Sequence, residues 1–350
     1  MRVKFLSVLF IYFCACGHTV HGNGAEALSR GYKFAVNANP SGRCDYLVLS
    51  EAWHFLSSKF YKQVTSKQIY GYALKGLEYA SGNNTTLFSN RKTNKYSAWY
   101  FWPLVVRASR ISGKNKSQLC YASIEAIVRK IDDPYKGFYV PQKAKIAVKW
   151  MIAPKENHPE PVATCKKYRG AIYCNIMVFD TRTIEEFLSA FNPLKDGSKK
   201  FILDLRNSKG GLTEVCRKTL GLLWLGTKPA YIVLDNNNNK ETMHALYNGT
   251  PLLKGFRSAV LINKRTYSSS EFFSSAVKDS KSAVLIGENT YGKGILQYNY
   301  FLPGGGVIKV SILRVLSSNG KKLNGVGVSP DIYVKDIDNA PLSKALEILK

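Results

Sequence analysis

Residues 259–278 read AVLINKRTYSSSEFFSSAVK, and this segment indicates the fold most directly. Its first four residues are apolar, as in a buried strand, and a helical pattern begins near Ser268. A serine at such a strand-to-helix turn lies at the edge of a sheet, and the N–H groups that follow it lie at a helix N-terminus, where negative charge is stabilised. The commoner role of Ser268, Ser269 and Ser270 at this place is simply to cap the helix.

Short apolar segments alternate with helical segments on both sides of this stretch. The pattern predicts strands at 171–179, 201–205, 231–234 and 283–286, helices at 183–191 and 213–224, and a hairpin of strands at 297–302 and 307–315. Such alternation is typical of an α/β layer. We therefore predict an α/β core over residues 171–335, followed by a C-terminal helix within residues 336–350.

A different pattern precedes the core. Apolar residues recur at helical spacing through residues 45–80 and again through 120–131, and Thr65 or Ser66 is placed to cap a helix. We predict a small helical N-terminal domain over residues 22–141 and a linker over 142–170. Its aromatic cluster, residues 99–102, either packs on the core or forms a substrate-holding surface. Packing is favoured because aromatic side chains are mostly buried.

The N-terminus has the pattern of an export signal. Two basic residues within positions 1–4 precede an apolar run at 5–13, which is too short for a transmembrane helix. We expect a signal peptide in residues 1–17 and a protein that is periplasmic, in the cell envelope or secreted. In the alternative, Cys16 becomes a lipidated N-terminus and attaches the protein to a membrane.

Cysteines and charge limit the classes of function. Removal of the signal peptide leaves an odd number of the seven cysteines, so at least one stays unpaired in a monomer. Cys165 and Cys174 flank a basic turn and either form a hairpin disulfide or remain buried thiols. The scattered histidines and the lack of a CxxC pair predict no metal and no cofactor. The net charge of +26 is spread along the chain, as on a solvated surface, and predicts no nucleic-acid partner.

Two further glycine-rich segments follow predicted strands. In the first, Lys293 lies between Gly292 and Gly294, and such flanking glycines let the backbone approach closely. A lysine acts as a general base only when neutral, so burial has to lower its pKa from about 10.4 to about 7 or 8. In the second, Gly210 and Gly211 can present N–H groups to an oxyanion. Taken singly, each segment is more often a plain turn.

Together the three segments resemble the carboxyl-terminal processing peptidases, also called tail-specific proteases. These are S41-type Ser-Lys peptidases with a crotonase-like (ClpP/crotonase) α/β core. Residues 266–271, TYSSSE, line up with the family's Thr-Ala-Ser-Ala-Ser-Glu, and residues 292–297, GKGILQ, with Gly-Lys-Gly-x-x-Gln. The resemblance implies that Ser268 is the nucleophile, Lys293 its base and Gln297 a residue that helps to orient the lysine.

The third segment is similar to the family's Asp-Leu-Arg-x-Asn-x-Gly-Gly and covers residues 204–211. It implies an oxyanion hole made from the backbone of Gly210 or Gly211 and of Ser269. Ser208 and Lys209 stand where the family has Asn and Pro. The family also inserts a PDZ domain, which reads the substrate's C-terminus by strand addition. The few dozen residues between 141 and 168 are too few for one, so we expect substrate capture elsewhere.

The resemblance implies a serine endopeptidase that acts on polypeptides without a cofactor. One alternative is a peptide-binding or scaffold protein that keeps the peptidase fold without turnover. The joint presence of Ser268, Lys293 and Gln297 counts against it. Another alternative is a crotonase-like acyl-CoA enzyme, since a fold does not determine chemistry. The export signal counts against that one, because CoA thioesters are cytosolic.

Overall fold

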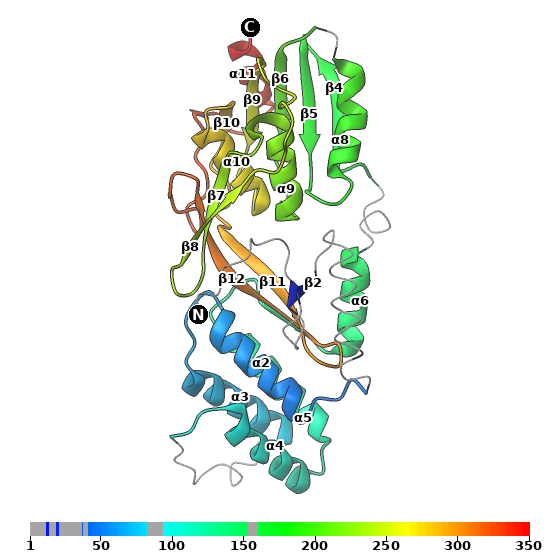
Figure 1. Cartoon of the computed structure of the whole chain (residues 1–350), viewed down its shortest axis with the longest axis vertical. Coiled ribbons are helices and arrows are strands. Elements are labelled where there is room, and N and C mark those ends of the chain that lie inside the picture. The colour runs from blue at the N-terminus through cyan, green and yellow to red at the C-terminus, as the bar shows by residue number, and fades with distance from the viewer. Residues whose placement is uncertain are drawn as a thin grey trace. The chain divides into compact units, whose positions relative to one another are not determined.

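The computed structural model describes residues 41–82, 94–152, 160–195 and 197–350, with residue 37 and the backbone of a short antiparallel pair, β1 (Tyr12–Phe13) and β2 (Thr19–Val20). Apart from that pair, the predicted signal peptide and Cys16 lie outside the described residues. The chain divides into two compact units (Figure 1). The first is Met1–Ala153 with Gln297–Leu313, and the second is Pro154–Leu296 with Arg314–Lys350. Among the described residues, no helix has the length and apolarity that crossing a membrane requires.

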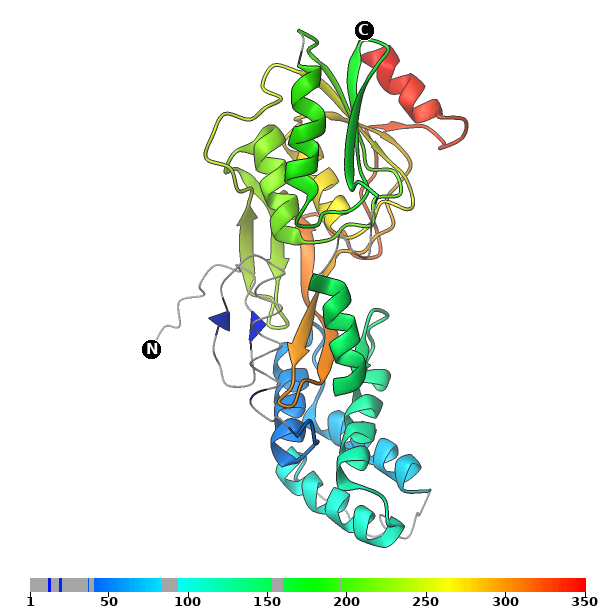
Figure 2. The same ribbon diagram turned by 90° about the vertical axis from the view of Figure 1, so that its right-hand side faces the viewer.

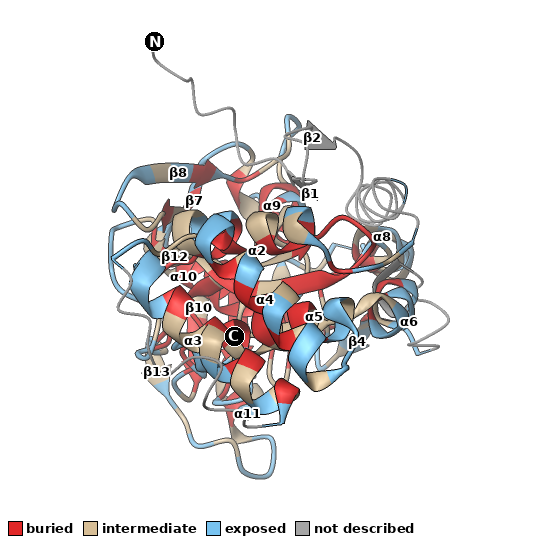
Figure 3. Ribbon diagram, turned by 90° about the horizontal axis from the view of Figure 1, so that it is seen from below, coloured by how far each residue is buried: buried red, intermediate tan, exposed pale blue. Residues whose placement is uncertain are grey.

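The first unit is mainly helical, as the sequence predicts. Its helices are α2 (Tyr46–Lys59), α3 (Ser66–Ser81), α4 (Ala98–Ser112), α5 (Lys116–Lys130) and α6 (Pro141–Ile152). Helices α2 to α5 each present a buried and an exposed face (Figure 3). The predicted cap is confirmed, because Thr65 Oγ1 accepts the N–H of Gln68 while the Gln68 side chain accepts the N–H of Thr65.

The aromatic cluster on α4 packs only in part, so the predicted packing is wrong for half of it. Phe101 is fully buried, with its ring 5.9 Å from that of Trp53. Trp99 remains 66% exposed and Tyr100 43% exposed. The difference follows from the helix itself, because consecutive residues are about 100° apart around its axis and cannot all face the same core.

A β-hairpin completes the first unit. Strand β11 (Ile295–Phe301) neighbours β12 (Val307–Ser317), whose first residues pair antiparallel with β3 (Gly137–Tyr139). The ring of Tyr300 stacks on Phe55 of α2 at 4.1 Å. This hairpin lies within the core predicted for residues 171–335, yet Gln297–Leu313 belongs to the helical unit, since its aromatic residues pack on α2.

The second unit is built on a six-stranded sheet in the order β13-β10-β9-β6-β5-β4. All neighbouring strands are parallel except the edge strand β4, which is antiparallel to β5. The strands are β4 (Ala163–Tyr168), β5 (Ala171–Ile176), β6 (Lys200–Asp204), β9 (Arg257–Ile262), β10 (Val284–Gly287) and β13 (Ile332–Tyr333). Strand β4 lies in the stretch predicted as a linker over 142–170, and α6 occupies its beginning.

Helices cover both faces of this sheet. Helix α11 (Ala340–Ile348) packs Ala345 on one face, against Ile202 and Leu261 (Figure 2). The other face carries α8 (Thr183–Phe191), α9 (Thr213–Leu220) and α10 (Ser269–Asp279), with short helical turns at Asn192–Leu194 and Gly221–Leu225. Strands β7 (Pro229–Leu234) and β8 (Lys240–His244) form a hairpin that pairs with the end of β12. The predicted α/β fold class is therefore confirmed.

The parallel strands determine where chemistry can occur in this unit. Strands β6, β9 and β10 run in the same direction, so their carboxyl ends lie at one edge of the sheet. The loops that follow them, at residues 205–212, 263–268 and 288–294, are the three segments that the sequence singled out. Ligands of open α/β sheets bind outside the carboxyl ends of the strands.

Candidate active site

Ser268 lies at the turn between β9 and α10 in a conformation that costs energy. Its backbone has φ 59° and ψ −129°, which a non-glycine residue rarely adopts and which is expected to cost about 1–3 kcal/mol. The side chain is half-buried. Such a sharp strand-to-helix turn, with the serine at its apex, is the geometry that exposes a nucleophilic hydroxyl above a sheet.

Glu271 holds this turn against the lysine loop. One carboxylate oxygen accepts the N–H of Ser268 at 2.8 Å and the N–H of Lys293 at 2.7 Å. The other oxygen accepts the Thr290 hydroxyl and the N–H of Gly292, both at 2.6 Å. The side chain is fully buried. Burial raises the pKa of Glu271 above its ordinary value, whereas the four donors act to lower it.

Lys293 is buried, with 9% of its surface exposed. Its Nζ lies 5.8 Å from the centroid of the Tyr267 ring, the residue immediately before Ser268. A close backbone approach brings the loop inward, because a Cβ on Gly294 would lie only 2.2 Å from the backbone nitrogen of Asn324. The flanking glycine is therefore required here, as the sequence suggested, and the lysine is enclosed beside the serine turn.

The glycine pair lies directly against the serine. A Cβ on Gly210 would lie 2.8 Å from the Ser268 Cβ and 2.8 Å from the Ser269 nitrogen, so only glycine fits. The N–H of Gly210 donates to Ser270 Oγ at 3.1 Å, and Ser270 Oγ is 2.7 Å from Ser208 Oγ. Ser208, which replaces the family's Asn, thus fixes this loop through a buried pair of hydroxyls.

Two N–H groups of the predicted oxyanion hole have no acceptor among the described residues. Among the hydrogen bonds of the described residues, the N–H of Ser269, at the start of α10, and the N–H of Gly211 donate to none. The two residues touch, since the Ser269 hydroxyl donates to the Gly211 carbonyl at 2.8 Å. The N–H of Gly210 is already used by Ser270. Of the sequence-predicted set, Gly211 and Ser269 therefore have the free donors.

The other residues singled out in the sequence make contacts of their own. The Gln297 amide donates to the Tyr135 carbonyl at 2.7 Å within the first unit, and its role in orienting the lysine stays a prediction. Cys165 and Cys174 form a disulfide between β4 and β5. A second disulfide, which the sequence did not indicate, joins Cys44 to Cys120. Within the described ranges no group of three or more His, Cys, Asp or Glu side chains is placed to hold a metal ion.

Sequence reasoning missed the two residues that organise the site. In the sequence, Glu271 is only one letter of the motif TYSSSE. An acid at the third position of a helix nevertheless often accepts the backbone N–H of the N-cap residue, which here is Ser268. Thr290 accepts the N–H of Val328 while it donates to Glu271. The sequence around Thr290 does not indicate this role, because its partners Val328 and Glu271 lie 38 and 19 residues away along the chain.

The α/β unit matches a known protein family. Residues 171–334, which include the serine turn, match the model of peptidase family S41. Over these residues the chain is similar to peptidase family S41. The family that the sequence resembles is thereby confirmed, and the mixed α/β fold agrees with it.

Individual relatives support the same family. The chain is 30% identical over 159 residues to a probable CtpA-like serine protease of Staphylococcus saprophyticus, covering 45% of this chain and 32% of the relative. It is 29% identical over 178 residues to the corresponding protein of Staphylococcus haemolyticus, covering 51% of this chain and 36% of the relative. The chain thus spans about a third of the length of these curated relatives.

Solved structures show the same fold. The photosystem II D1 C-terminal processing protease has a TM-score of 0.59 at 19% identity, covering 87% of this chain and 97% of that chain. A lipoprotein from Streptococcus agalactiae has a TM-score of 0.54 at 17% identity, covering 82% and 96%. At these identities the likeness concerns the fold alone.

Proposed function

We propose that this protein is an exported serine endopeptidase that hydrolyses polypeptides, with Ser268 as nucleophile and Lys293 as general base. One observation carries the proposal. The Glu271 carboxylate binds the backbone N–H of Ser268 and of Lys293 on the same oxygen. Two residues that are far apart in the sequence are thereby held on a single atom, with the lysine buried.

The proposed reaction begins with attack of Ser268 Oγ on the substrate carbonyl carbon while Lys293 Nζ takes the hydroxyl proton. The resulting oxyanion is stabilised by the N–H groups of Ser269 and Gly211, at the start of α10 where the helix dipole also favours negative charge. Lys293 then gives its proton to the leaving amine as the C–N bond breaks. Water, deprotonated by Lys293, releases the acyl group from Ser268 by the same route.

The strained turn supports this role of Ser268. A serine that only capped the helix would sit in an extended conformation, as N-cap residues usually do. Here the positive φ costs energy and is maintained by Glu271 and by the Tyr267 N–H, which donates to the Ser208 carbonyl at 3.2 Å. Strain that neighbouring contacts maintain is typical of functional positions.

The experiment compares the wild type with Ser268→Ala and Lys293→Ala in the cleavage of casein, followed by mass spectrometry. Ser282→Ala and Lys228→Ala are controls that remove the same groups outside the three site loops. We expect the wild type and the controls to produce the same peptides, and the two site variants to lose at least about a thousandfold in rate. Equal cleavage by all five proteins, or a wild type that binds casein without cutting it, would refute the assignment and favour the scaffold alternative.

A further inference from the structure

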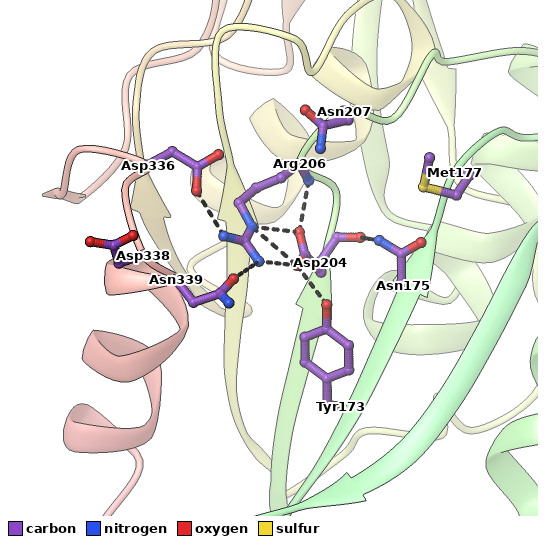
Figure 4. A pocket seen from close by; sticks show the side chains of 9 residues that line it. All are labelled: Tyr173, Asn175, Met177, Asp204, Arg206, Asn207, Asp336, Asp338 and Asn339. Atoms are coloured by element: carbon purple, nitrogen blue, oxygen red, sulfur yellow. Dashed lines mark hydrogen bonds and ion pairs between the residues drawn. The ribbon is translucent and has the colours of Figure 1, made fainter.

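A polar cavity of about 490 Å³ opens at the edge of the sheet where β5 and β6 end, which is also the edge that carries the serine turn (Figure 4). Its residues come from β5, the end of β6 and the segment before α11, all within the second unit. They are Tyr173, Asn175, Met177, Asp204, Arg206, Asn207, Asp336, Asp338 and Asn339. Its size lies within the usual range of ligand pockets.

The two inner carboxylates of the cavity are already engaged. Asp204 accepts Arg206 Nη2 at 2.6 Å and the Tyr173 hydroxyl at 2.7 Å. Asp336 accepts Arg206 Nη1 at 2.8 Å and the amide of Asn263 at 2.8 Å. Because their oxygens are taken by protein donors, these carboxylates form a fixed acidic wall and are not free ligands for a metal ion.

Polar groups at the cavity surface remain available. Within the described part of the chain, the exposed Asp338 carboxylate makes no hydrogen bond or ion pair. Asn175 uses its amide N–H on the Asp204 carbonyl, which leaves its side-chain oxygen as an acceptor. A ligand therefore meets a free carboxylate and a free amide oxygen.

The charge of the cavity is opposite to that of the chain. Lys and Arg outnumber Asp and Glu by 50 to 24 in the sequence, whereas the lining has three carboxylates and one guanidinium. Arg265 also acts on Asp336 from outside the lining, and the local balance stays negative when it is counted. Clefts of one charge sign focus the field and attract the opposite charge, so this one favours a cation.

The cavity and the serine share one loop. Asn207 lines the cavity, and Gly210 lies three residues later against Ser268, so the Cα atoms of Asn207 and Gly210 are at most about 11 Å apart. An extended peptide advances about 3.3 Å per residue. A substrate whose scissile bond lies at Ser268 can therefore reach the cavity with a residue a few positions from that bond.

We propose that this cavity is a subsite that receives a cationic side chain, lysine or arginine, of the polypeptide substrate, with Asp338 as its ionic partner. The proposal rests on the proposed function for its substrate class. It gives the protein a means of selecting substrates by an internal basic residue, in a chain where no PDZ domain is expected.

The test uses acetylated, amidated peptides that carry arginine at one of five positions on either side of the cut site, each paired with a peptide that carries citrulline there. Citrulline keeps the shape of arginine without the charge. We expect arginine to be favoured at one position, and Asp338→Asn to lower that preference about two- to fivefold. Asn tolerates the positive φ of 50° at this position, so the fold is kept.

Two further variants strengthen the comparison. Asn339→Asp adds a carboxylate to the lining and should raise the arginine preference, because Asp also tolerates the positive φ of 59°. Glu347→Gln removes an exposed carboxylate from α11 outside the cavity and should leave the preference as in the wild type. Glu347→Gln should also cleave the citrulline peptides at the wild-type rate, and salt should reduce the arginine preference.

Binding to the Ser268→Ala variant, measured by fluorescence anisotropy, separates the subsite from catalysis. If the wild type cleaves peptides but treats arginine and citrulline alike at every position, the subsite is refuted while the peptidase function stands. If no peptide is cleaved but Ser268→Ala prefers arginine and Asp338→Asn removes that preference, the subsite stands and the peptidase function fails. Equal binding of both peptides by Ser268→Ala would overturn the subsite.

Discussion

At the scale of single residues, the site depends on a buried acid that performs no chemistry itself. Both oxygens of Glu271 are saturated by donors from the serine turn and the lysine loop. The ionised carboxylate can only accept hydrogen bonds. Any change that turns one of its oxygens into a donor therefore breaks a hydrogen bond to the serine turn or to the lysine loop. Positions of Ser268 and Lys293 are therefore coupled through one side chain.

Replacement of Glu271 by glutamine tests this coupling. The amide NH₂ of glutamine is a donor and would face backbone N–H groups, which are also donors. We therefore expect the free energy of unfolding to fall by about 2–4 kcal/mol and the cleavage rate to fall about a hundredfold. Thermal unfolding and casein cleavage are the measurements. Ser275→Ala in the same helix, which removes a buried hydroxyl away from the site, is the control. Full activity of Glu271→Gln would contradict a positioning role.

The pH dependence of Glu271 follows from its raised pKa. The folded protein holds this proton more tightly than the unfolded chain does, at a reference value of 4.5. Its contribution to the free energy of unfolding therefore declines as pH rises from about 4.5 to the raised pKa and is constant above it. Cleavage should change in the opposite sense, because protonation releases an N–H contact. As the pH falls through the raised pKa of Glu271, we expect the cleavage rate to fall while protonation of Glu271 does not lower the melting temperature. In Glu271→Gln, this decrease of the cleavage rate on the acid side should be absent.

The residues themselves divide into those that local sequence can reveal and those it cannot. Ser268, Lys293 and Gly210 stand in short motifs after strands, so spacing alone points to them. Glu271 acquires its role only when the loop at 290–293 folds over it. The N–H of Gly210 is used because it donates to the hydroxyl of Ser270, which is paired with that of Ser208, whereas the N–H of Gly211 stays free in the described part of the chain. The sequence does not show this pairing, because it depends on residues that come together only in the fold.

At the scale of elements, the helices and central strands were predictable because their periodicity is strong. Helices α2 and α3 and strands β6, β9 and β10 fall close to the predicted ranges. Strand β4 was missed because its Lys166 and Lys167 look like a polar turn. Lysines on an edge strand are a common protection against pairing with another chain, and β4 is the edge of the sheet.

The two disulfides should differ in their effect on stability. Cys44 and Cys120 are 76 residues apart, whereas Cys165 and Cys174 are 9 apart. A longer closed loop restricts the unfolded chain more, so loss of the first bond should cost about 4–5 kcal/mol and loss of the second about 2–3 kcal/mol. Thermal unfolding of the two Cys→Ala double variants measures this order.

A reversed order, with the hairpin bond contributing more, would contradict the unfolded-chain explanation.

Cys216 serves as the internal reference in both variants. It is the free cysteine among the described residues, it is buried, and burial raises its pKa. Its thiol should therefore stay unmodified by alkylating reagents until the protein unfolds.

At the scale of the whole molecule, the chain combines a helical unit and a peptidase unit with a strongly basic surface. The sequence predicted both units but placed the hairpin at Gln297–Leu313 with the peptidase core, because chain order does not show which partner a hairpin packs on. Nor did it show the acidic cavity, whose lining comes from three separate segments. Under the proposed function, this acidic cavity lets a basic protein select among polypeptides by charge.

The most direct measurement is covalent labelling with a serine-directed fluorophosphonate, read by mass spectrometry of the modified peptide. We expect the wild type to carry the label on Ser268, and Lys293→Arg to lose it, because arginine fills the space but does not act as a base near neutral pH. Lys228→Arg, at an exposed position outside the three site loops, should label as the wild type does. A label on another serine, or equal labelling of Ser268 in the Lys293→Arg variant, would contradict the pairing of Ser268 with Lys293.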